Sequence, residues 1–274
     1  MITFPNAKIN LGLNIVARRP DGYHNLETAF YPIALRDILE MVPAPAGAAT
    51  SLATYGIAVE CEPEKNLVVR AVRLMQSRYA VPDVEIHLTK NIPHGAGLGG
   101  GSSDAAFALV MLNEMFNLGL PKSELAAHAA TLGADCPFFV YNEPMMATGI
   151  GDRLAPISLS LAGKALYLVK PAVHVATAQA YAGVTPQPAV RSLADDLAAP
   201  VASWHRNVKN DFEPSVFKAH PSLAAIKRKI VDAGALYAAM SGSGASIFGI
   251  FDSANMAEQL LGTIPCERDF VINL

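Results

Sequence analysis

The stretch Asn91-Ile-Pro-His-Gly-Ala-Gly-Leu-Gly-Gly-Gly-Ser-Ser-Asp104 places five glycines within seven positions. Glycine has no Cβ atom, so this backbone can take positive φ angles and bring its N–H groups close around a ligand. Ser102, Ser103 and Asp104 follow, and these residue types are favoured as N-caps of the apolar helix predicted from Ala105 onward. A glycine loop that opens a helix presents unpaired N–H donors at the positive end of the helix dipole. The stretch therefore predicts a phosphate-binding loop.

Two better-known phosphate loops share part of this pattern but do not fit it. Gly95, Gly97 and Gly100 satisfy the dinucleotide-binding pattern G-x-G-x-x-G, which also requires an acidic residue at the end of a strand about 20 positions on. Residues 113–117 occupy that position and still lie in the predicted helix. The P-loop pattern requires lysine where this chain has Gly101. A flexible glycine linker is a further alternative, which the adjoining N-cap residues disfavour.

The composition predicts a folded protein whose substrate lies in a pocket. The 274 residues suffice for one large domain or two ordinary ones, of which we favour two, and 51% of them are hydrophobic. A formal net charge of −3 without runs of Lys or Arg gives no reason to expect a nucleic-acid partner or an acidic membrane. No stretch approaches the roughly 18 uninterrupted apolar residues of a membrane helix. A small molecule is therefore the expected partner.

The cysteines and histidines match none of the common metal or disulfide frameworks. The chain has 3 cysteines without a C-x-x-C pair, and none of its 7 histidines belongs to an H-E-x-x-H pattern. We therefore expect no metal ion held directly by protein side chains. A strand pattern begins near the N-terminus and leaves no room for a signal peptide, so the cytoplasm is the expected location. A monomer or a weak homodimer is the expected assembly.

Strict alternation of polar and apolar residues marks the first strand. Its apolar positions are Ile9, Leu11, Leu13 and Ile15. The opposite, polar face carries Lys8 and Asn10 together. Arg19-Pro-Asp-Gly22 then predicts a turn, and Tyr23 and His24 follow it directly. This strand alone leaves two interpretations of Lys8 open, a solvated surface lysine and a functional one.

A helix and a strand precede the glycine loop. Residues 66–79 carry apolar side chains at helical spacing, with Asn66 as the natural N-cap. Residues 84–90 alternate and predict a strand that brings Lys90 to the start of the loop. Beyond the loop and its helix, Asp135 is a candidate N-cap for a following helical turn, a role that is compatible with catalysis.

The second half of the chain predicts further strands and helices, which makes the fold class α+β. We place a domain boundary in the turn-rich stretch 147–153, which gives domains 1–153 and 154–274. The proline-rich segment 183–201 predicts mobile surface structure near a cleft. Ser241-Gly-Ser-Gly-Ala-Ser246 is a second glycine loop, for which a tight turn between strands and a ligand contact are equally open.

Five motifs together resemble the GHMP small-molecule kinases, the superfamily that includes galactokinase, homoserine kinase and mevalonate kinase. In chain order they are Pro5-Asn-Ala-Lys-Ile-Asn-Leu11, Asp21-Gly-Tyr-His24, Pro93-His-Gly-Ala-Gly-Leu-Gly-Gly-Gly-Ser-Ser-Asp104, Leu132-Gly-Ala-Asp-Cys-Pro137 and Ser241-Gly-Ser-Gly-Ala245. The second and fourth are similar to those of the branch that phosphorylates the 2-hydroxyl of 4-diphosphocytidyl-2-C-methyl-D-erythritol, in the non-mevalonate route to isoprenoid precursors. The resemblance implies a GHMP kinase two-domain fold, with a ribosomal protein S5 domain 2-like N-terminal domain, a ferredoxin-like C-terminal domain and ligands in the cleft between them.

The resemblance also implies roles for individual residues. ATP with Mg²⁺ would donate the phosphoryl group, Asp135 would accept the proton of the substrate hydroxyl, and Lys8 beside it would favour the charged forms. The residues implied to bind ATP are Asn66, Lys90, Pro93, His94, Gly95, Ala96, Gly97, Leu98, Gly99, Gly100, Gly101, Ser102 and Ser103. The residues implied to bind the acceptor are Asn10, Tyr23, His24, Thr177 and Tyr181, with Tyr23 and His24 meeting the cytosine and Tyr181 stacking on its other face. His94 and Ala96 depart mildly from the family's loop, and the segment after Gly183 aligns poorly.

This assembly suits phosphoryl transfer, to which a protein contributes positioning and charge neutralisation more than covalent chemistry. Aromatic side chains suit a flat pyrimidine, since stacking contributes roughly 1 to 3 kcal/mol per base. Two other functions are alternatives: a GHMP kinase of the homoserine or mevalonate type, and a non-catalytic nucleotide-binding protein. The first is distinguished by turnover without a nucleotide-bearing acceptor, and the second by the lack of ADP release with any acceptor.

Overall fold

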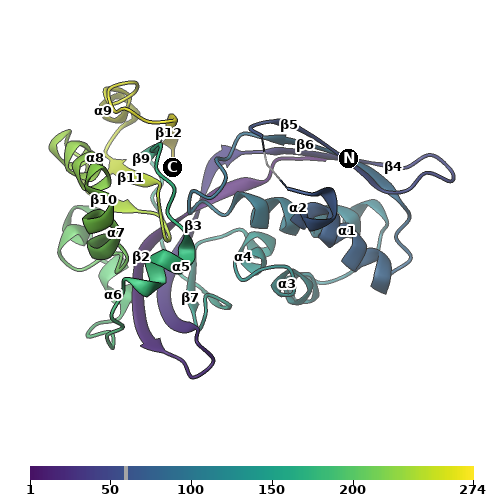
Figure 1. Ribbon diagram of the computed structural model, residues 1–274, viewed down its shortest axis with the longest axis horizontal. Coiled ribbons are helices and arrows are strands. Elements are labelled where there is room, and N and C mark those ends of the chain that lie inside the picture. The colour runs from purple at the N-terminus through teal and green to yellow at the C-terminus, as the bar shows by residue number, and fades with distance from the viewer. Residues whose placement is uncertain (59–60) are drawn as a thin grey trace. The chain divides into compact units, whose positions relative to one another are not determined.

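A computed structural model of the chain describes residues 1–58 and 61–274 and divides into two compact units (Figure 1). Unit 1 comprises Met1–Ala7, Leu35–His94 and Gly99–Glu143, and unit 2 comprises Lys8–Ala34, Gly95–Leu98 and Pro144–Leu274. The chain passes between the units within two long strands and within the glycine loop, so neither unit is a continuous half of the sequence. The domain boundary expected near residue 153 stays a prediction.

The sheet of unit 1 has the strand order β1-β4-β6-β5. Its strands are β1 (Ile2–Thr3), β4 (Ile38–Pro43), β5 (Ser51–Gly56) and β6 (Val84–Lys90). The central strand β6 pairs antiparallel with β4 and parallel with β5. Its side chains alternate between buried and half-buried positions, which confirms the predicted strand and places Lys90 on the buried face.

Helices α1 (Leu67–Arg78), α2 (Gly100–Met115), α3 (Lys122–Ala130) and α4 (Cys136–Tyr141) belong to unit 1 and lie on one side of its sheet (Figure 1). A short 3₁₀ helix (Pro63–Lys65) precedes α1. The helix α2 packs against the other three, and most of its apolar residues are buried. The predicted N-cap of α1 is confirmed, because Asn66 Oδ1 accepts a hydrogen bond from the backbone N–H of Val68 at 2.9 Å.

The prediction that Ser102, Ser103 and Asp104 cap the helix after the glycine loop is wrong. That helix, α2, begins at Gly100, and its N-cap is Gly99 with a φ of 71°. Glycine reaches this left-handed conformation without the steric cost that a Cβ imposes, so the chain turns into the helix before it reaches the serines. Ser103 and Asp104 consequently lie buried inside the first turns of α2.

The long strands of unit 2 belong to a sheet with the order β2-β3-β7-β8. Its strands are β2 (Asn6–Arg18), β3 (His24–Arg36), β7 (Met145–Thr148) and β8 (Arg153–Pro156). The predicted turn between β2 and β3 is confirmed: the backbone N–H of Arg19 donates to the carbonyl of Tyr23 at 2.8 Å, and Gly22 has a φ of 88°. The turn-rich stretch around residue 150 joins β7 and β8 as a hairpin.

An antiparallel sheet with the order β10-β11-β9-β12 completes unit 2. Its strands are β9 (Ala165–Lys170), β10 (Tyr237–Met240), β11 (Ile247–Phe251) and β12 (Arg268–Asn273). Helices α8 (Pro221–Asp232) and α9 (Ala254–Glu258) pack against it. Along the chain these elements follow as β9-α8-β10-β11-α9-β12, which is the β-α-β-β-α-β arrangement of a ferredoxin-like domain. This part of the predicted fold is confirmed.

The segment between β9 and α8 contains helices α5 (Thr177–Ala182), α6 (Leu193–Leu197) and α7 (Glu213–Ala219), with a 3₁₀ helix (Val201–Arg206). Segment 183–201 lies mostly at the surface, as predicted, but α6 within it buries its two leucines. A Cβ added at Gly12 of β2 would lie only 2.6 Å from Leu193 Cδ1, so α6 packs directly on the backbone of β2. The sequence did not reveal this helix because it is short and lies between Pro188 and Pro200.

Candidate active site

The glycine loop has the conformation that its composition predicts. Gly95, Gly97 and Gly99 have φ angles of 61°, 74° and 71°, so every second residue is left-handed. Alternation of this kind turns successive backbone N–H groups toward one side of the chain and forms an anion-binding nest. Between these glycines the side chains of Ala96 and Leu98 are buried, which fixes the loop to the protein.

The second glycine loop holds the first one in place. It is the turn between β10 and β11, and within it the hydroxyl of Ser241 donates to the carbonyl of Gly97 at 2.9 Å. A Cβ at Gly97 would lie 2.1 Å from the carbonyl oxygen of Ser241, a distance that only glycine permits. The tight-turn interpretation of residues 241–246 is therefore correct, and the turn also has a contact role.

Lys8 lies on β2 with 4% of its surface exposed, which excludes the interpretation as a solvated lysine. Its Nζ donates to Asn10 Oδ1 at 2.7 Å and lies 4.8 Å above the centre of the Phe30 ring. Its backbone N–H donates to the carbonyl of Leu98 at 3.0 Å, so the strand and the glycine loop are hydrogen-bonded at this residue. The ammonium group is thus held in a fixed position next to the loop.

Asn10 lies on the same face of β2, as the alternation predicted, and is almost fully buried. Its Nδ2 donates to Thr28 Oγ1 at 3.0 Å, and the Thr28 hydroxyl donates in turn to the carbonyl of Gly12 at 2.5 Å. Its backbone N–H donates to Ser241 Oγ at 3.3 Å. These bonds orient the amide that receives Lys8, so Asn10 has a positioning role whether or not it also touches the acceptor.

The side chain of Lys90 is committed to a buried ion cluster in unit 1. Its Nζ contacts Asp37 and lies 2.5 Å from Asp104 Oδ2. Burial disfavours the charged amine, but the two carboxylates outweigh it and raise the pKa of Lys90. Burial raises the pKa of Asp104 to about 7, in spite of the opposing charge of Lys90. The predicted contact of Lys90 with the nucleoside stays a prediction. In this structure its ammonium contacts the carboxylates of Asp37 and Asp104.

Asn66 lies at the start of α1, next to the helix that follows the glycine loop. A Cβ added at Gly101 of α2 would meet Leu67 Cδ1 at 3.8 Å, so the first residue of α1 packs close to the first turn of α2. This places Asn66 near the exit of the loop, where a nucleoside contact is feasible. That contact stays a prediction.

Asp135 occupies the N-cap position of α4, as expected, but its carboxylate makes no capping hydrogen bond. The residue is half-buried, and Pro137 stands within the first helical turn. At the other end of α4, Asn142 Nδ2 donates to Asn6 Oδ1 at 2.9 Å and ties the helix to the beginning of β2. Capping therefore does not account for the carboxylate of Asp135.

The residues expected to bind the cytosine lie in unit 2, and His24 lies directly on Tyr181. Their ring centroids are 5.1 Å apart with 25° between the planes, and the Tyr181 ring meets Phe212 edge-on at 4.8 Å. This separation is that of two rings in contact, which leaves no space for a base between them. Tyr23, by contrast, is 62% exposed. The expected arrangement of rings on two faces of a base is therefore not preformed.

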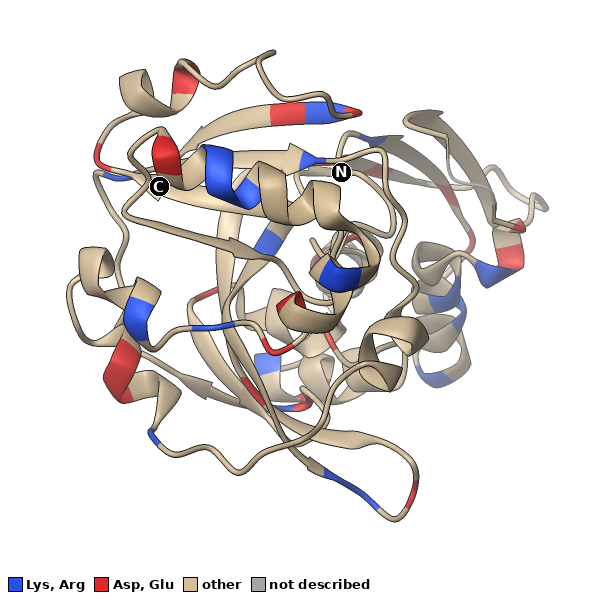
Figure 2. Cartoon of the chain, turned by 60° about the vertical axis from the view of Figure 1, so that its left-hand side comes forward, with Lys and Arg blue, Asp and Glu red and all other residues tan. Residues whose placement is uncertain are grey.

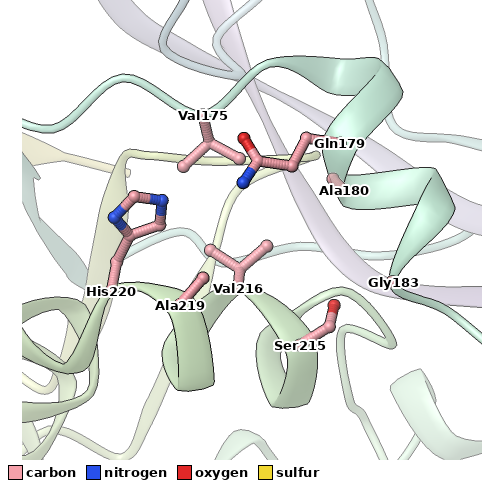
Figure 3. A pocket seen from close by; sticks show the side chains of 8 residues that line it. All are labelled: Val175, Gln179, Ala180, Gly183, Ser215, Val216, Ala219 and His220. Atoms are coloured by element: carbon pink, nitrogen blue, oxygen red, sulfur yellow. The ribbon is translucent and has the colours of Figure 1, made fainter.

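Thr177 is the first residue of α5, and its hydroxyl lies 3.2 Å from that of Ser243 in the second glycine loop. Other residues of α5 face a pocket of about 180 Å³ beside α7, in which Gln179 and His220 point toward one another (Figure 3). Its lining residues are Val175, Gln179, Ala180, Gly183, Ser215, Val216, Ala219 and His220. Ligand pockets usually measure about 300 to 1,000 Å³. This pocket is too small for a nucleotide and is separate from the predicted acceptor residues.

Four residues with clear roles at the site were missed in the sequence. Thr28 and Phe30 share one face of β3. Their spacing in the sequence predicts this common face, but it does not predict that Thr28 bonds Asn10 or that Phe30 contacts Lys8. Ser241 was predicted as part of a second glycine loop, but its hydrogen bond to the phosphate loop was not. Asp37, a lone charge between two strands, carried no periodic signal at all.

Acidic and basic residues are scattered over many elements, as Figure 2 shows. Across residues 1–58 and 61–274 no helix is both long and apolar enough to cross a membrane. In the same described part of the chain, no three His, Cys, Asp or Glu side chains are grouped as a metal site requires.

Comparison with known proteins extends this description to the whole chain. Residues 66–143 match the model of the GHMP kinases N terminal domain, and residues 189–267 match that of the GHMP kinases C terminal domain. A homoserine kinase from Cytophaga hutchinsonii shares the fold, with a TM-score of 0.73 at 19% identity over 98% of this chain and 94% of the other.

More similar relatives narrow the assignment. A 4-diphosphocytidyl-2-C-methyl-D-erythritol kinase from Parabacteroides distasonis is 53% identical over 92% of both chains. One of the same name from Bacteroides thetaiotaomicron is 50% identical over 100% of this chain and 97% of its own. The crystal structure of a 4-(cytidine 5'-diphospho)-2C-methyl-D-erythritol kinase superposes with a TM-score of 0.81 at 32% identity, covering 99% of this chain and 98% of the other. The chain therefore belongs to the 4-diphosphocytidyl-2-C-methyl-D-erythritol kinase family of the GHMP kinases.

Proposed function

We propose that the chain transfers the γ-phosphoryl group of ATP to the 2-hydroxyl of 4-diphosphocytidyl-2-C-methyl-D-erythritol, in the non-mevalonate route to isoprenoid precursors. The observation that carries this proposal is the double attachment of Lys8. Its backbone N–H bonds the carbonyl of Leu98, while its ammonium is fixed by Asn10. A fixed positive charge is thereby joined to a loop shaped for phosphate, which is what phosphoryl transfer requires. The identity of the acceptor follows from the names of the relatives.

The donor side of the reaction rests on the glycine loop. The loop of residues 95–103 holds the ATP phosphates through its backbone N–H groups, and Lys8 supplies the positive charge that a P-loop lysine supplies in other nucleotide-binding proteins. Asn66 and Lys90 remain the proposed contacts on the nucleoside side. The left-handed φ angles of Gly95, Gly97 and Gly99 support this role.

Mg²⁺ fits this site as an ion that arrives with the nucleotide. The described residues offer no cage of three or more ligating side chains. Magnesium in kinases is usually held by substrate phosphates with one or two protein oxygens and several waters. Held mainly by the ATP phosphates and by waters, the ion would neutralise charge on the transferring phosphate.

Asp135 is the proposed base at the acceptor. Its carboxylate accepts the proton of the 2-hydroxyl as the oxygen forms its bond to the γ-phosphorus, and the bond from that phosphorus to the β-phosphate oxygen breaks to release ADP. Lys8 stabilises the negative charge that develops on the oxygens. The half-buried position of Asp135 at the start of α4 supports this assignment.

The cytidine end of the acceptor is assigned to unit 2. We place the base against the stacked pair of His24 and Tyr181, with Tyr23 as an exposed outer contact and Thr177 and Asn10 toward the polyol. Because the two rings already touch, the base either displaces His24 or stacks on the outside of the pair. Stacking alone contributes roughly 1 to 3 kcal/mol per base.

We further place the protein in the cytoplasm as a monomer or weak homodimer. Cys61 is an exposed free thiol, and Cys136 and Cys266 are free as well, which suits a reducing compartment. Size-exclusion chromatography with light scattering at several concentrations tests the assembly.

An ADP-release assay with a panel of acceptors tests the proposed function. We expect turnover with the cytidine-linked polyol and Mg²⁺, and background rates with homoserine, with mevalonate and without acceptor. Phosphorus NMR of the product distinguishes the 2-phosphate from other esters. Turnover of homoserine or mevalonate at a comparable rate would overturn the substrate assignment, and ATP binding without ADP release for any acceptor would favour a non-catalytic role.

A further inference from the structure

Lys90, Asp37 and Asp104 form a buried ion cluster at the base of the glycine loop, which we call the neck cluster. Their exposed fractions are 5%, 0% and 2%. Charged side chains are almost never buried to this extent unless they are paired, and pairing one ammonium with two carboxylates leaves an excess negative charge when both are ionised. Burying this net charge costs free energy of folding, so the cluster calls for a functional explanation.

The neck cluster touches the chain on both sides of the loop. Asp37 Oδ1 accepts hydrogen bonds from the backbone N–H groups of Asn91 and Ile92, at 2.6 and 2.8 Å, where the chain enters the loop. Asp104 lies on α2, where the chain leaves the loop. Lys90 contacts both carboxylates and links the two sides.

Close packing at the same place supports this view. A Cβ added at Gly100, the first residue of α2, would lie 2.9 Å from Ile92 Cγ2 and 3.5 Å from Lys90 Nζ. The entrance and exit of the loop are therefore in contact, and a side chain at Gly100 would push them apart. Because the two ends of the glycine loop are held this close together, the contacts at its base restrict the conformation of the loop.

We propose that Asp37, Lys90 and Asp104 act as positioning residues that close the neck of the glycine loop and so set its affinity for the triphosphate of ATP. The inference rests on one part of the proposed function, the binding of ATP by the glycine loop. Asp37 and Asp104 act through the loop backbone and do not touch the nucleotide. Within the described part of the chain Asp104 Oδ1 has no hydrogen-bond partner, so this carboxyl can carry a proton without losing its contact to Lys90.

Direct ATP binding to the full-length protein tests the proposal, measured by isothermal titration calorimetry with Mg²⁺ and without acceptor. We expect Asp104→Ala to weaken ATP binding by about tenfold to a hundredfold, since misplacing a binding group by about 1 Å has effects of this size. Asp104→Asn keeps an oxygen for Lys90 and should stay within about threefold of the parent. With acceptor, Asp104→Ala should raise the KM for ATP while kcat at saturating ATP changes little.

Leu109→Ala is the matched control, because Leu109 is fully buried on the same helix and lies outside the neck cluster. We expect it to lower the urea midpoint but to leave the ATP dissociation constant within about threefold, since cavity formation destabilises the fold without displacing the loop. Equal weakening by Leu109→Ala and Asp104→Ala would overturn the proposal, and so would parent-like ATP binding by folded Asp104→Ala.

Hydrogen–deuterium exchange keeps the test decisive if Asp104→Ala does not fold. In Asp104→Leu, which replaces the carboxyl by an apolar group of similar size and removes its contact to Lys90, amides of residues 91–99 should exchange faster than in the parent, while those of α3 are unchanged. Unchanged exchange at residues 91–99 would count against the neck cluster as a positioning device. Calorimetry, urea denaturation and hydrogen exchange require no acceptor, so their outcome is independent of whether the substrate assignment holds.

Discussion

The hydroxyl of Ser241 donates a hydrogen bond to the carbonyl of Gly97 and joins two glycine loops that are 144 residues apart in sequence. Ser241 also accepts the backbone N–H of Asn10, the residue that holds the ammonium of Lys8. The phosphate loop, the lysine and the ferredoxin-like sheet of unit 2 are thereby connected through one side chain. The conformation of the loop at Gly97 depends on this connection.

Gly97→Ala should abolish most ATP binding. The new Cβ would meet the Ser241 carbonyl oxygen at 2.1 Å, and the left-handed backbone adds strain. We expect ATP binding to fall by about two orders of magnitude, since backbone must move to relieve the clash. Gly163→Ala is the control: Gly163 has a φ of 82°, and a Cβ added there would meet no described atom within 4 Å, so this variant carries only the strain, about 1 to 2 kcal/mol. Similar losses of ATP affinity in both variants would contradict the role of the Ser241 contact.

Asp135→Asn should lower kcat by about 10² to 10⁴ while leaving ATP affinity nearly intact. The amide is close to the carboxylate in size and shape, so the variant should fold, which a urea midpoint measured on the same preparation checks. Single-turnover kinetics and ATP titration of the same preparation separate the two effects. A variant with near-normal turnover would remove Asp135 from the role of base.

Tyr181→Ala should raise the KM for the cytidine-linked acceptor by about tenfold or more without changing the KM for ATP, because a base loses a stacking partner of roughly 1 to 3 kcal/mol. Tyr181→Phe keeps the ring against His24 and Phe212 and should behave like the parent. Tyr23→Ala should have the smaller effect of the two alanine variants, since the Tyr23 ring is 62% exposed whereas Tyr181 is already stacked on His24. If Tyr23→Ala had the larger effect, the stacked pair would not be the platform for the base.

Local patterns predicted much of this molecule, and long-range packing explains what they missed. Alternation placed Lys8 and Asn10 on one face of β2, and the asparagine at position 66 caps α1 as expected. The glycine run predicted a left-handed loop correctly but not where its helix begins, because capping propensities of Ser102 to Asp104 cannot reveal that Gly99 turns the chain first. The role of Asp37 could not be predicted from local patterns, because its partners Lys90 and Asp104 lie 53 residues or more further along the chain.

The raised pKa of Asp104 predicts how the free energy of unfolding depends on pH. Its pKa in the folded protein is raised to about 7, whereas an unfolded chain has about 4 for this side chain. The folded state therefore holds the proton more tightly, and the stability that this proton confers is fully present below about pH 4 and is lost as the pH rises to about 7. Lys90 and Asp37 face the group, and the raised pKa of Lys90 keeps the ammonium charged throughout this range.

Asp104→Asn mimics the protonated carboxyl at every pH and should remove this dependence. We expect the parent to lose unfolding free energy between pH 5 and pH 8 by about 1 to 3 kcal/mol, and the variant to lose less because the buried net charge never forms. Urea denaturation at pH 5, 6, 7 and 8, with the slope on denaturant held common, measures the difference. The exposed Asp252→Asn serves as the control, since Asp252 pairs with Lys164 at the surface and is expected to leave the profile unchanged. Parallel profiles for the parent and Asp104→Asn would show that Asp104 does not titrate in this range.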